Sequence, residues 1–336
     1  MNARTQSWLP CLLLLLAHQA VAHADWISAK QNKMGTRVEV QIWHLDAAAA
    51  DRLLSAAMAE FDRIESSMST YIAASEISVL NASAANAPVR VSAELYGIID
   101  KSLQLSELTQ GAFDISYDSV GQHYDYRAGK RPPAETIRAA LPAIDYRLIK
   151  LDAERSTIRY EREGLRINLG GIAKGYAIES VINLLREAGV RHAMAAAGGD
   201  TRILGDRQGK PWIVGIRDPD DESGIVTRLA LKDEAISTSG DYERFFMDGD
   251  VRYHHILNPA TGESATGVRS ATVVGPDAVM ADALSTSVFV LGPVAGLELI
   301  ESLPGYEAVV IDGARGVRLS TGLTPPATQR DAPPTY

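Results

Sequence analysis

The order of short strands and amphipathic helices constrains this fold more than any other feature of the sequence. Alternating apolar residues predict a strand over 35–43, and apolar residues at helical spacing predict helices over 47–68 and 92–109. Further strands are expected at 148–152, 157–162, 165–169, 192–196, 212–216, 226–231, 253–257, 271–274, 308–311 and 317–319, and helices at 134–141, 173–188, 280–291 and 295–302. Strands in hairpins mixed with helices predict an α+β fold with mixed, largely antiparallel sheets.

The first 24 residues have the pattern of a cleaved signal peptide. Arg4 gives a positive start, an apolar run follows from Leu9 to Ala17, and Ala22-His23-Ala24 supplies the small residues of a cleavage site. A lasting membrane anchor needs about 20 apolar residues, and this run is shorter. We therefore expect export to the periplasm; an uncleaved N-terminal anchor is the alternative.

Cysteine and charge exclude several classes of function. The single cysteine, Cys11, lies inside the leader, ahead of its leucine run, so the exported protein would have neither a disulfide nor a lipoprotein anchor. The chain has 33 Lys and Arg against 42 Asp and Glu, a net charge of −9, and no basic run. Binding to nucleic acid requires a basic surface, so we expect no nucleic-acid partner.

The rest of the chain is expected to form one domain over 25–323. The segment 126–133 is polar and contains Gly and Pro, which predicts a surface excursion. Residues 324–336 contain four of the chain's 15 prolines and few apolar residues, which predicts a disordered tail.

The strongest local motif is a strand that runs through two glycines directly into a helix, Asn168-Leu169-Gly170-Gly171-Ile172-Ala173-Lys174-Gly175. Glycines allow the backbone to approach a ligand closely, and a helix N-terminus offers free N–H groups and a favourable dipole. Lys174 adds a positive charge, so the motif predicts a cradle for a pyrophosphate. Its spacing is that of neither the dinucleotide fingerprint nor the P-loop, and a plain tight turn is the alternative.

Two further segments carry groups suited to chemistry. Asp282 and Thr286 are four residues apart and face one side of a helix, where a carboxylate and a hydroxyl suit a hard cation such as Mg²⁺. His255 ends a strand before an Asn-Pro-Ala-Thr-Gly turn and is a candidate general base. His254 points to the other face, so at most one of the two histidines is expected in the site. Both segments also have purely structural explanations, as a helix start and a strand end.

Three smaller motifs predict only turns when each is taken alone: Gly111 to Asp114, Ala197 to Asp200, and the polar loop Ser237 to Asp241. Taken together and in order, the motifs resemble the ApbE family, the FAD:protein FMN transferases. The resemblance covers residues 26–323 and rests on Met34-Gly35-Thr36, Ser69-Thr70-Tyr71, Ser75-Glu76-Ile77, Leu80-Asn81, Gly111 to Asp114, Leu169 to Tyr176, Ala197 to Asp200, Thr238 to Asp241, His255 to Gly262 and Ala281 to Thr286. It implies a T-fold-related architecture.

The resemblance also implies an activity and a set of site residues. Similar proteins bind FAD with its diphosphate bridged by Mg²⁺, transfer the FMN part to a Ser or Thr hydroxyl of a partner, and release AMP. By this resemblance the Mg²⁺ ligands are Asp282, Thr286, the adjacent Ser285 and the carbonyl of Gly171, and the FAD site is lined by Met34, Tyr71, Ala112, Phe113, Asp114, Asn168, Lys174 and Ile256. The catalytic groups would be His255 or Asp114 as the base, with Lys174 neutralising the diphosphate.

The chain departs from the family pattern at three places. Asn168 and Asn258 stand where the family usually has Asp, which removes two carboxylates from the site region. Tyr117-Asp118-Ser119-Val120 replaces the family's usual Pro-Leu segment, which alters the expected shape of the flavin pocket.

The implied partners are periplasmic FMN acceptors, such as subunits of sodium-pumping quinone reductases or Rnf-type complexes and other FMN-binding domains. Two other functions fit the same sequence: an FAD pyrophosphatase that releases FMN and AMP, and a flavin-binding protein without turnover. Self-modification at Thr272 is disfavoured, because its surroundings predict a buried strand.

Overall fold

The computed structural model describes residues 24–323. The predicted leader, except for its last residue, and the predicted tail lie outside the described residues. Within them, no helix is long and apolar enough to cross a membrane.

An eight-stranded sheet forms the centre of the molecule, with the strand order β1-β2-β6-β7-β10-β15-β16-β17. Its strands are β1 (Asp25–Lys33), β2 (Thr36–His44), β6 (Ala193–Ala197), β7 (Asp200–Leu204), β10 (Ala235–Gly240), β15 (Val268–Gly275), β16 (Glu307–Asp312) and β17 (Val317–Leu319). Every neighbouring pair is antiparallel. The expected α+β class with antiparallel sheets is therefore confirmed.

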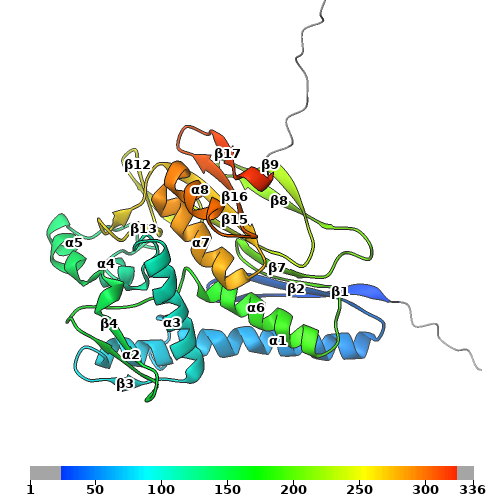
Figure 1. Ribbon diagram of the computed structural model, residues 1–336, viewed down its shortest axis with the longest axis horizontal. Coiled ribbons are helices and arrows are strands. Elements are labelled where there is room, and N and C mark those ends of the chain that lie inside the picture. The colour runs from blue at the N-terminus through cyan, green and yellow to red at the C-terminus, as the bar shows by residue number, and fades with distance from the viewer. Residues whose placement is uncertain (1–23, 324–336) are drawn as a thin grey trace, which may run out of the picture.

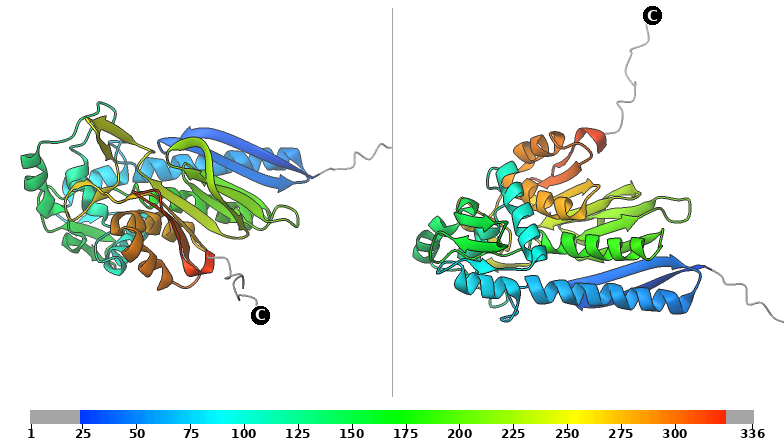
Figure 2. Two further views of the ribbon diagram at one scale, coloured as in Figure 1. Left: turned by 90° about the horizontal axis from the view of Figure 1, so that it is seen from above. Right: turned by 60° about the horizontal axis from the view of Figure 1, so that its bottom comes forward.

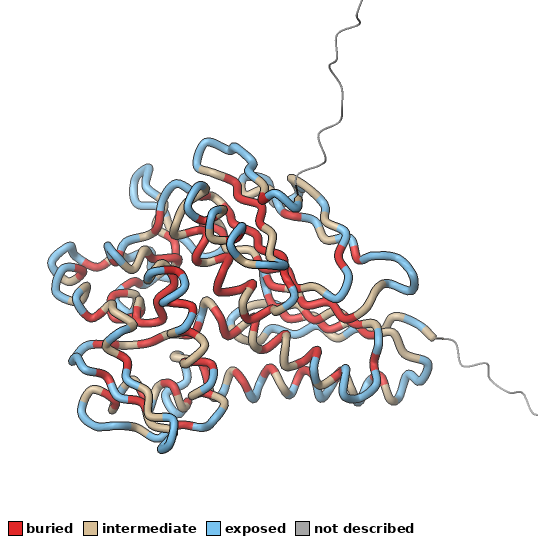
Figure 3. Tube along the Cα trace, in the orientation of Figure 1, coloured by how far each residue is buried: buried red, intermediate tan, exposed pale blue. Residues whose placement is uncertain are grey.

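Four helices cover one face of this sheet: α1 (Ala47–Met68), α6 (Ala173–Glu187), α7 (Ala278–Leu291) and α8 (Pro293–Glu301). They lie side by side, α1 against β1 and β2, α6 against β6 and β7, α7 against β10 and β15, and α8 against β16. The right-hand view of Figure 2 shows α1 running along the β1–β2 hairpin. The main hydrophobic core fills the space between helices and sheet, and Figure 3 shows this interior as nearly continuous burial.

A smaller core lies on the other face of the sheet. The hairpin of β8 (Trp212–Asp218) and β9 (Asp221–Leu231) covers it, and Trp212 packs against apolar side chains of the sheet, among them Ile203, Ile236 and Val274. The site elements described below belong to the helix-covered side.

The remaining elements form a lobe at one end of the sheet, on the left in Figure 1. They are α2 (Glu76–Ser83), β3 (Val89–Arg90), α3 (Ala93–Leu108), η1 (Ile115–Tyr117), α4 (Asp118–Gly121), α5 (Ala134–Ala140), η2 (Leu141–Ala143), η3 (Tyr146–Leu148), β4 (Ile149–Asp152) and β5 (Thr157–Tyr160). Two short hairpins, β11 (Phe245–Asp248) with β12 (Val251–His254) and β13 (Leu257–Asn258) with β14 (Glu263–Ser264), connect β10 to β15. The last element is η4 (Thr321–Leu323).

The prediction of a strand over 165–169 was wrong. The segment is extended, but side chains replace a neighbouring strand as hydrogen-bond partners: the Asn81 amide bonds both the N–H and the carbonyl of Ile167, and the Arg166 N–H donates to the Ser119 hydroxyl. This arrangement satisfies the backbone without a ladder. It leads the chain into the Gly170-Gly171 turn.

The polar segment Ser237 to Gly240 is also not a loop, because it lies within β10. Its Ser237 and Ser239 side chains face the hydroxyl-bearing side of α7, as described next, and Thr238 pairs with Thr272 of β15.

Candidate functional site

The start of α6, the start of β7, strand β10 and helix α7 meet around the Lys174 ammonium. Its Nζ lies 2.6 Å from Oδ2 of Asp200, and 3.3 and 3.5 Å from Oδ1 and Oδ2 of Asp282. The two aspartates are 1 and 2 % exposed. Three segments that are remote in sequence thus place one cation between two buried carboxylates.

Gly175 allows α6 and α7 to approach closely enough for this contact. Its N–H donates to Oδ2 of Asp282 at 2.9 Å. A Cβ at this position would lie 2.3 Å from the carbonyl oxygen of Ala278, which no side chain can do without moving the backbone. The free N–H of the helix start therefore fixes Asp282, as the glycine-bearing motif suggested for an anion.

A cluster of hydroxyl groups joins β10 to α7 beside Asp282. The Ser285 hydroxyl lies 3.1 Å from that of Ser237 and 2.9 Å from that of Ser239, and it donates to the carbonyl of Asp282 at 2.9 Å. Thr286 Oγ1 lies 3.2 Å from Ser239 Oγ. Because Ser285 is fully buried and has three partners within the protein, its geometry favours supporting Ser239 and Thr286 over binding an ion directly.

Gly171, the predicted backbone ligand, lies next to Thr286. A Cβ on Gly171 would be 3.3 Å from Thr286 Oγ1 and 3.3 Å from a ring carbon of Phe113. The predicted metal residues Gly171, Asp282 and Thr286 therefore come together with the predicted flavin residue Phe113, although they derive from distant parts of the chain.

Burial and charge shift the pKa values of this centre. Burial disfavours the charged form of Lys174, but Asp200 and Asp282 outweigh it and hold the pKa of the ammonium well above its usual range. Burial, followed by the charge of Asp200, raises the pKa of Asp282 to about 6, although Lys174 and the Gly175 N–H oppose the shift. Because burial and Asp200 both disfavour the charged form of Asp282, a further cation next to Asp282 would stabilise its carboxylate.

His255 follows β12 and is anchored by the backbone of Arg244. Its N–H donates to the Arg244 carbonyl at 3.1 Å, and its ring Nδ1 lies 3.3 Å from the same oxygen. Because a carbonyl only accepts, Nδ1 carries the proton and Nε2 is left as the basic nitrogen. Burial, then the positive charge of Arg244, lowers the pKa of His255 to about 3, so the imidazole is neutral.

His254 is turned away from the site, as its position in the strand predicted. It is 3 % exposed, its Nε2 lies 2.9 Å from the carbonyl of Ala265, and its ring packs edge-on against Phe289. For His255, in contrast, the charge of Lys174 is one of the causes that lower the pKa.

Asp114, the other predicted base, is occupied by local hydrogen bonds. Oδ1 accepts from the N–H and the hydroxyl of Ser116, at 2.8 and 2.6 Å, and Oδ2 accepts from the N–H of Tyr146 at 2.9 Å. Burial raises its pKa despite these bonds. The geometry favours Asp114 as the residue that shapes the loop behind Phe113, and His255 as the base.

Asn168 organises the glycine turn. Its Oδ1 accepts from the Gly170 N–H at 2.9 Å, and its amide nitrogen lies 3.3 Å from the Thr70 hydroxyl and 3.4 Å from Asp118. Asp118 is in turn bound by Arg166 at 2.6 Å. An amide suits this position because it donates towards Asp118, whereas an aspartate here would face a second carboxylate.

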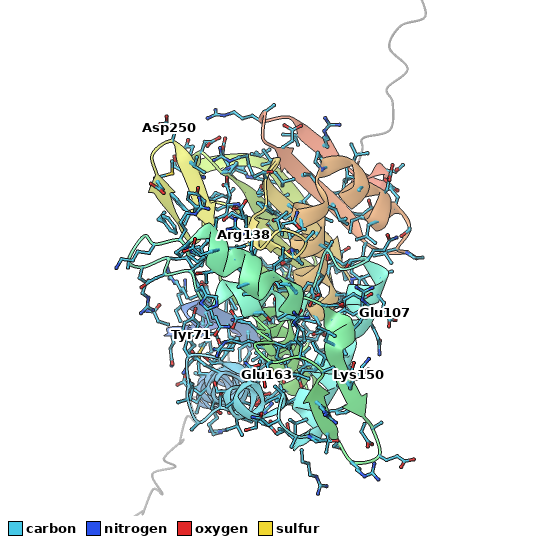
Figure 4. The ribbon with its side chains drawn as sticks, turned by 90° about the vertical axis from the view of Figure 1, so that its left-hand side faces the viewer. Tyr71, Glu107, Arg138, Lys150, Glu163 and Asp250 are labelled. Atoms are coloured by element: carbon cyan, nitrogen blue, oxygen red, sulfur yellow. The ribbon has the colours of Figure 1, made fainter. Side chains whose placement is uncertain are left out.

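The other predicted flavin residues lie in the turns and loops that follow β1, α1, α3 and β12. Met34 sits in a turn with a φ of 53°, and its N–H donates to Glu65 at 2.8 Å. Ile256 is buried beside His255, and Ala112 precedes Phe113. Tyr71 is 84 % exposed, and Figure 4 shows it on the same side of the molecule as Asp250, at the tip of the β11–β12 hairpin.

Three residues near the site were not found from the sequence. The Arg244 guanidinium lies 3.7 Å from the Cβ position of Gly35, and its charge affects the pKa values of Tyr117 and Tyr126 as well as that of His255. The Tyr117 hydroxyl lies 3.5 Å from the Cβ position of Gly170. The Tyr126 hydroxyl is buried without a hydrogen-bond partner in the described chain. Only the unusual Tyr117 segment gave a sequence signal.

The donor set of this site suits a hard divalent cation. Between residues 24 and 323, no three His, Cys, Asp or Glu side chains are grouped so that they could hold a metal ion. The available donors near Asp282 are instead the hydroxyl oxygen of Thr286 and the backbone of Gly171. Mg²⁺ takes oxygen ligands and commonly uses one or two carboxylates together with substrate phosphates, so this sparse set fits it.

A groove of about 700 Å³ lies on another side of the same loops, between the end of α3 and helices α7 and α8. Ala112 and Asn258 contribute to its wall, but Lys174, Asp282 and His255 do not. The groove is therefore separate from the charged centre.

Comparison with known proteins identifies the family. The model of the ApbE family matches residues 34–310. The chain belongs to the ApbE family. The FAD:protein FMN transferase of Treponema pallidum is 33 % identical over 269 residues, which cover 74 % of each chain. The enzyme of the same name from Vibrio cholerae is 29 % identical and covers 88 % of this chain and 91 % of its own.

Solved ApbE structures have the same fold. The ApbE protein of Thermotoga maritima superimposes with a TM-score of 0.82 at 31 % identity, covering 89 % of this chain and 98 % of its own. The flavin transferase ApbE from Vibrio cholerae gives 0.80 at 26 % identity, with the same coverage. The predicted ApbE-like architecture is thus confirmed.

Proposed function

We propose that this protein transfers FMN from FAD to a Ser or Thr hydroxyl of a periplasmic acceptor protein, with Mg²⁺ as cofactor and AMP as the leaving group. The observation that carries the proposal is the meeting of Gly171, Lys174, Asp282 and Thr286, together with a neutral His255 whose pKa the charge of Lys174 helps to lower. Membership of the ApbE family, whose relatives above are named FAD:protein FMN transferases, supports this choice of substrate.

The reaction requires an acceptor hydroxyl to attack the FMN phosphorus. A new P–O bond forms to the acceptor oxygen, the bond to the bridging oxygen breaks, and AMP leaves with that oxygen. Asp282, Thr286 and the Gly171 backbone would hold Mg²⁺, which supplies charge neutralisation on the diphosphate. Lys174 adds a second positive charge next to the same position.

His255 is the proposed acceptor of the proton of the attacking hydroxyl. Its Nδ1 proton is committed to the Arg244 carbonyl, which leaves Nε2 unprotonated at neutral pH. A threonine hydroxyl is a weak nucleophile at this pH, so a base within reach is needed. The Thr272 hydroxyl of this chain is no candidate acceptor, because Thr272 is fully buried and its hydroxyl lies 2.8 Å from that of Thr238.

The test is to incubate the protein with FAD, Mg²⁺ and a purified FMN-binding domain and to measure the intact mass of that domain. We expect the domain to gain the mass of one covalently bound FMN. Asp282→Ala should lower the rate of this transfer at least about a hundredfold, because it removes both the proposed Mg²⁺ ligand and the hydrogen-bond partner of the Gly175 N–H. Asp277→Asn is the matched control on the same helix, because Asp277 serves as the cap of α7.

Other results would point to the other functions. Release of free FMN and AMP without labelling would indicate a pyrophosphatase, and FAD that stays bound and intact would indicate a binding protein. Location is proposed from the leader pattern of residues 1–24. N-terminal sequencing of protein recovered from the periplasm should begin at Asp25, and an unprocessed terminus would contradict export with cleavage.

A further inference from the structure

Asp200 is a buried carboxylate that the proposed reaction does not use. It begins β7, directly after the Gly198-Gly199 turn, and is 1 % exposed. One oxygen accepts from Ser237 and the other lies 2.6 Å from Lys174 Nζ, so both oxygens have partners inside the protein. Both oxygens of this carboxylate are thus already engaged inside the protein.

The position of Asp200 is rigid. Its backbone pairs with β6 through Ala197 and with β10 through Ser237. A Cβ on the preceding Gly199 would lie 2.7 Å from the carbonyl oxygen of Thr238, so the backbone here is closely packed. Lys174, in contrast, reaches the centre on a flexible four-carbon stem. The fixed carboxylate therefore decides where the mobile ammonium lies.

The ammonium is unequally shared between the two carboxylates. It lies 2.6 Å from Asp200 but 3.3 Å from the nearer oxygen of Asp282. The first distance is that of a charge-assisted hydrogen bond, and the second is that of a weak one. Oδ2 of Asp282 is bound by the Gly175 N–H, whereas the ammonium is the one partner that Oδ1 has in the described chain. Oδ1 is thus the oxygen that an incoming cation would use.

We propose that Asp200 is a positioning residue that holds Lys174 away from Asp282, so that Asp282 is free to bind the divalent cation. Without Asp200, the ammonium would have Asp282 as its one remaining carboxylate and would move onto Oδ1. The cation would then have to displace a lysine. This inference rests on the proposed metal role of Asp282 and adds to it a residue for which no cation contact is proposed.

The experiment measures the affinity of the whole protein for Mn²⁺, which serves as a spectroscopic probe for the Mg²⁺ site. Binding is followed by the loss of the EPR signal of free Mn²⁺. Asp200→Asn should weaken Mn²⁺ binding about tenfold when Lys174 is present. With Lys174→Met, which removes the competing ammonium, the same substitution should weaken binding at most about threefold. Asp206→Asn, at an aspartate that pairs with Lys232 outside the charged centre, is the control and should change the affinity less than about threefold.

Enzyme kinetics and a crystal structure of the Asp200→Asn variant test the same proposal independently. In Asp200→Asn, the Mg²⁺ concentration for half-maximal FMN transfer should rise about tenfold, while the rate at saturating Mg²⁺ returns to within about threefold of the unchanged protein. A crystal structure of this variant should place Lys174 Nζ within about 3 Å of Asp282 Oδ1. Melting curves separate these effects from misfolding.

Several outcomes would overturn the proposal. If Asp200→Asn weakened Mn²⁺ binding equally with Lys174 and with Lys174→Met, Asp200 would act through its negative charge and not through the lysine. If Asp200→Asn left the Mn²⁺ affinity unchanged, Asp200 would have no role in cation binding. A lysine that stays away from Asp282 in the crystal would also contradict it. If the unchanged protein bound no Mn²⁺ at all, the proposed metal role of Asp282 itself would be wrong. If it bound Mn²⁺ but transferred no FMN, the proposed role of Asp200 would stand and the proposed transferase activity would be refuted.

Discussion

His255 has a neutral imidazole because its surroundings disfavour the charged form. Burial and the Arg244 charge act first, and His254 and Lys174 add to them, so that its pKa falls from 6.5 to about 3. A histidine with a lowered pKa is unprotonated above that value, so the base form exists throughout pH 5–8. Protonation of His255 therefore cannot limit the proposed reaction in that range.

The first prediction concerns this pKa. Arg244→Gln removes the second-largest cause of the shift, so the His255 pKa, followed by NMR titration of its ring protons, should rise by about one unit or more but stay below 6.5 because burial persists. Arg217→Gln, at an exposed arginine that pairs with Glu243, is the control and should leave the titration unchanged. A His255 pKa near 6.5 in the unchanged protein would refute the assignment, as would an acid limb of kcat/KM near pH 6.5 that disappears in His255→Asn.

At the scale of single residues, the sequence predicted which residues form the charged centre better than it predicted the role of each residue. Lys174, Asp282 and Thr286 do come together, because a glycine-bearing helix start and a helical i, i+4 pair are local patterns that a sequence displays. The second oxygen of Asp114 is occupied by the Tyr146 N–H, which comes from another part of the lobe. No local pattern could reveal this bond, and the same holds for the position of Arg244.

The pairing of helices α6 and α7 creates the site, and it depends on one small residue. The N–H of Gly175 reaches Asp282 only because no Cβ separates the two helices. The same close contact places Asp282 of α7 within hydrogen-bond distance of Lys174 of α6. Stability and function should therefore change together at this position.

The second prediction compares two glycine-to-alanine substitutions in helices. Gly175→Ala places a Cβ 2.3 Å from the Ala278 carbonyl, so it should destabilise the protein by about 2 kcal/mol or more and abolish FMN transfer. Gly97→Ala in α3 is the control: nothing lies within 4 Å of its Cβ, so a gain of about 0.5–1 kcal/mol is expected. Denaturant unfolding measures both. If the two variants had equal stability, steric closeness would not explain Gly175.

Helices with a strong periodic pattern were predicted nearly to the residue, as for α1 and α6. Strands β1 and β7 and helix α2 were not predicted, and two further errors have a common cause. The 165–169 segment looked like a strand, but side chains of Asn81 and Ser119 bond its backbone. Strand β10 looked like a loop because Ser237 and Ser239 face hydroxyls on α7 instead of apolar side chains. Both errors arise where tertiary contacts of the site replace the usual pattern.

At the scale of the whole molecule, the sheet joins both halves of the sequence. Strands from the first fifth of the chain, β1 and β2, lie beside β6, while the last strands extend the opposite edge. Among residues 24–323, the three hydrophobic cores consist of residues between 38 and 310, with partly buried neighbours from Trp26 to Leu323. The described residues therefore bring together three cores around one sheet.

The last prediction concerns the two ends of the chain. A chain shortened to residues 25–323 should keep its melting temperature within about 2 °C and its rate of FMN transfer within about twofold, because it keeps every core residue of the described sheet and helices. Removal of β1 as well, to give 34–323, is the control. It takes away nine residues that pair along the whole of β2, and it removes Trp26, whose ring packs against Trp43 and Trp212.

The second truncation should lower the melting temperature by at least about 5 °C, since it removes Trp26, Ile27 and Ala29 from the cores and leaves a new unpaired sheet edge. Differential scanning calorimetry of the two shortened chains checks this difference. If 25–323 were as unstable as 34–323, a terminal segment would contribute to the core. If both were as stable as the full chain, β1 would be dispensable, and the sheet would effectively begin at β2 with the Met34-Gly35 turn no longer held in place beside Arg244.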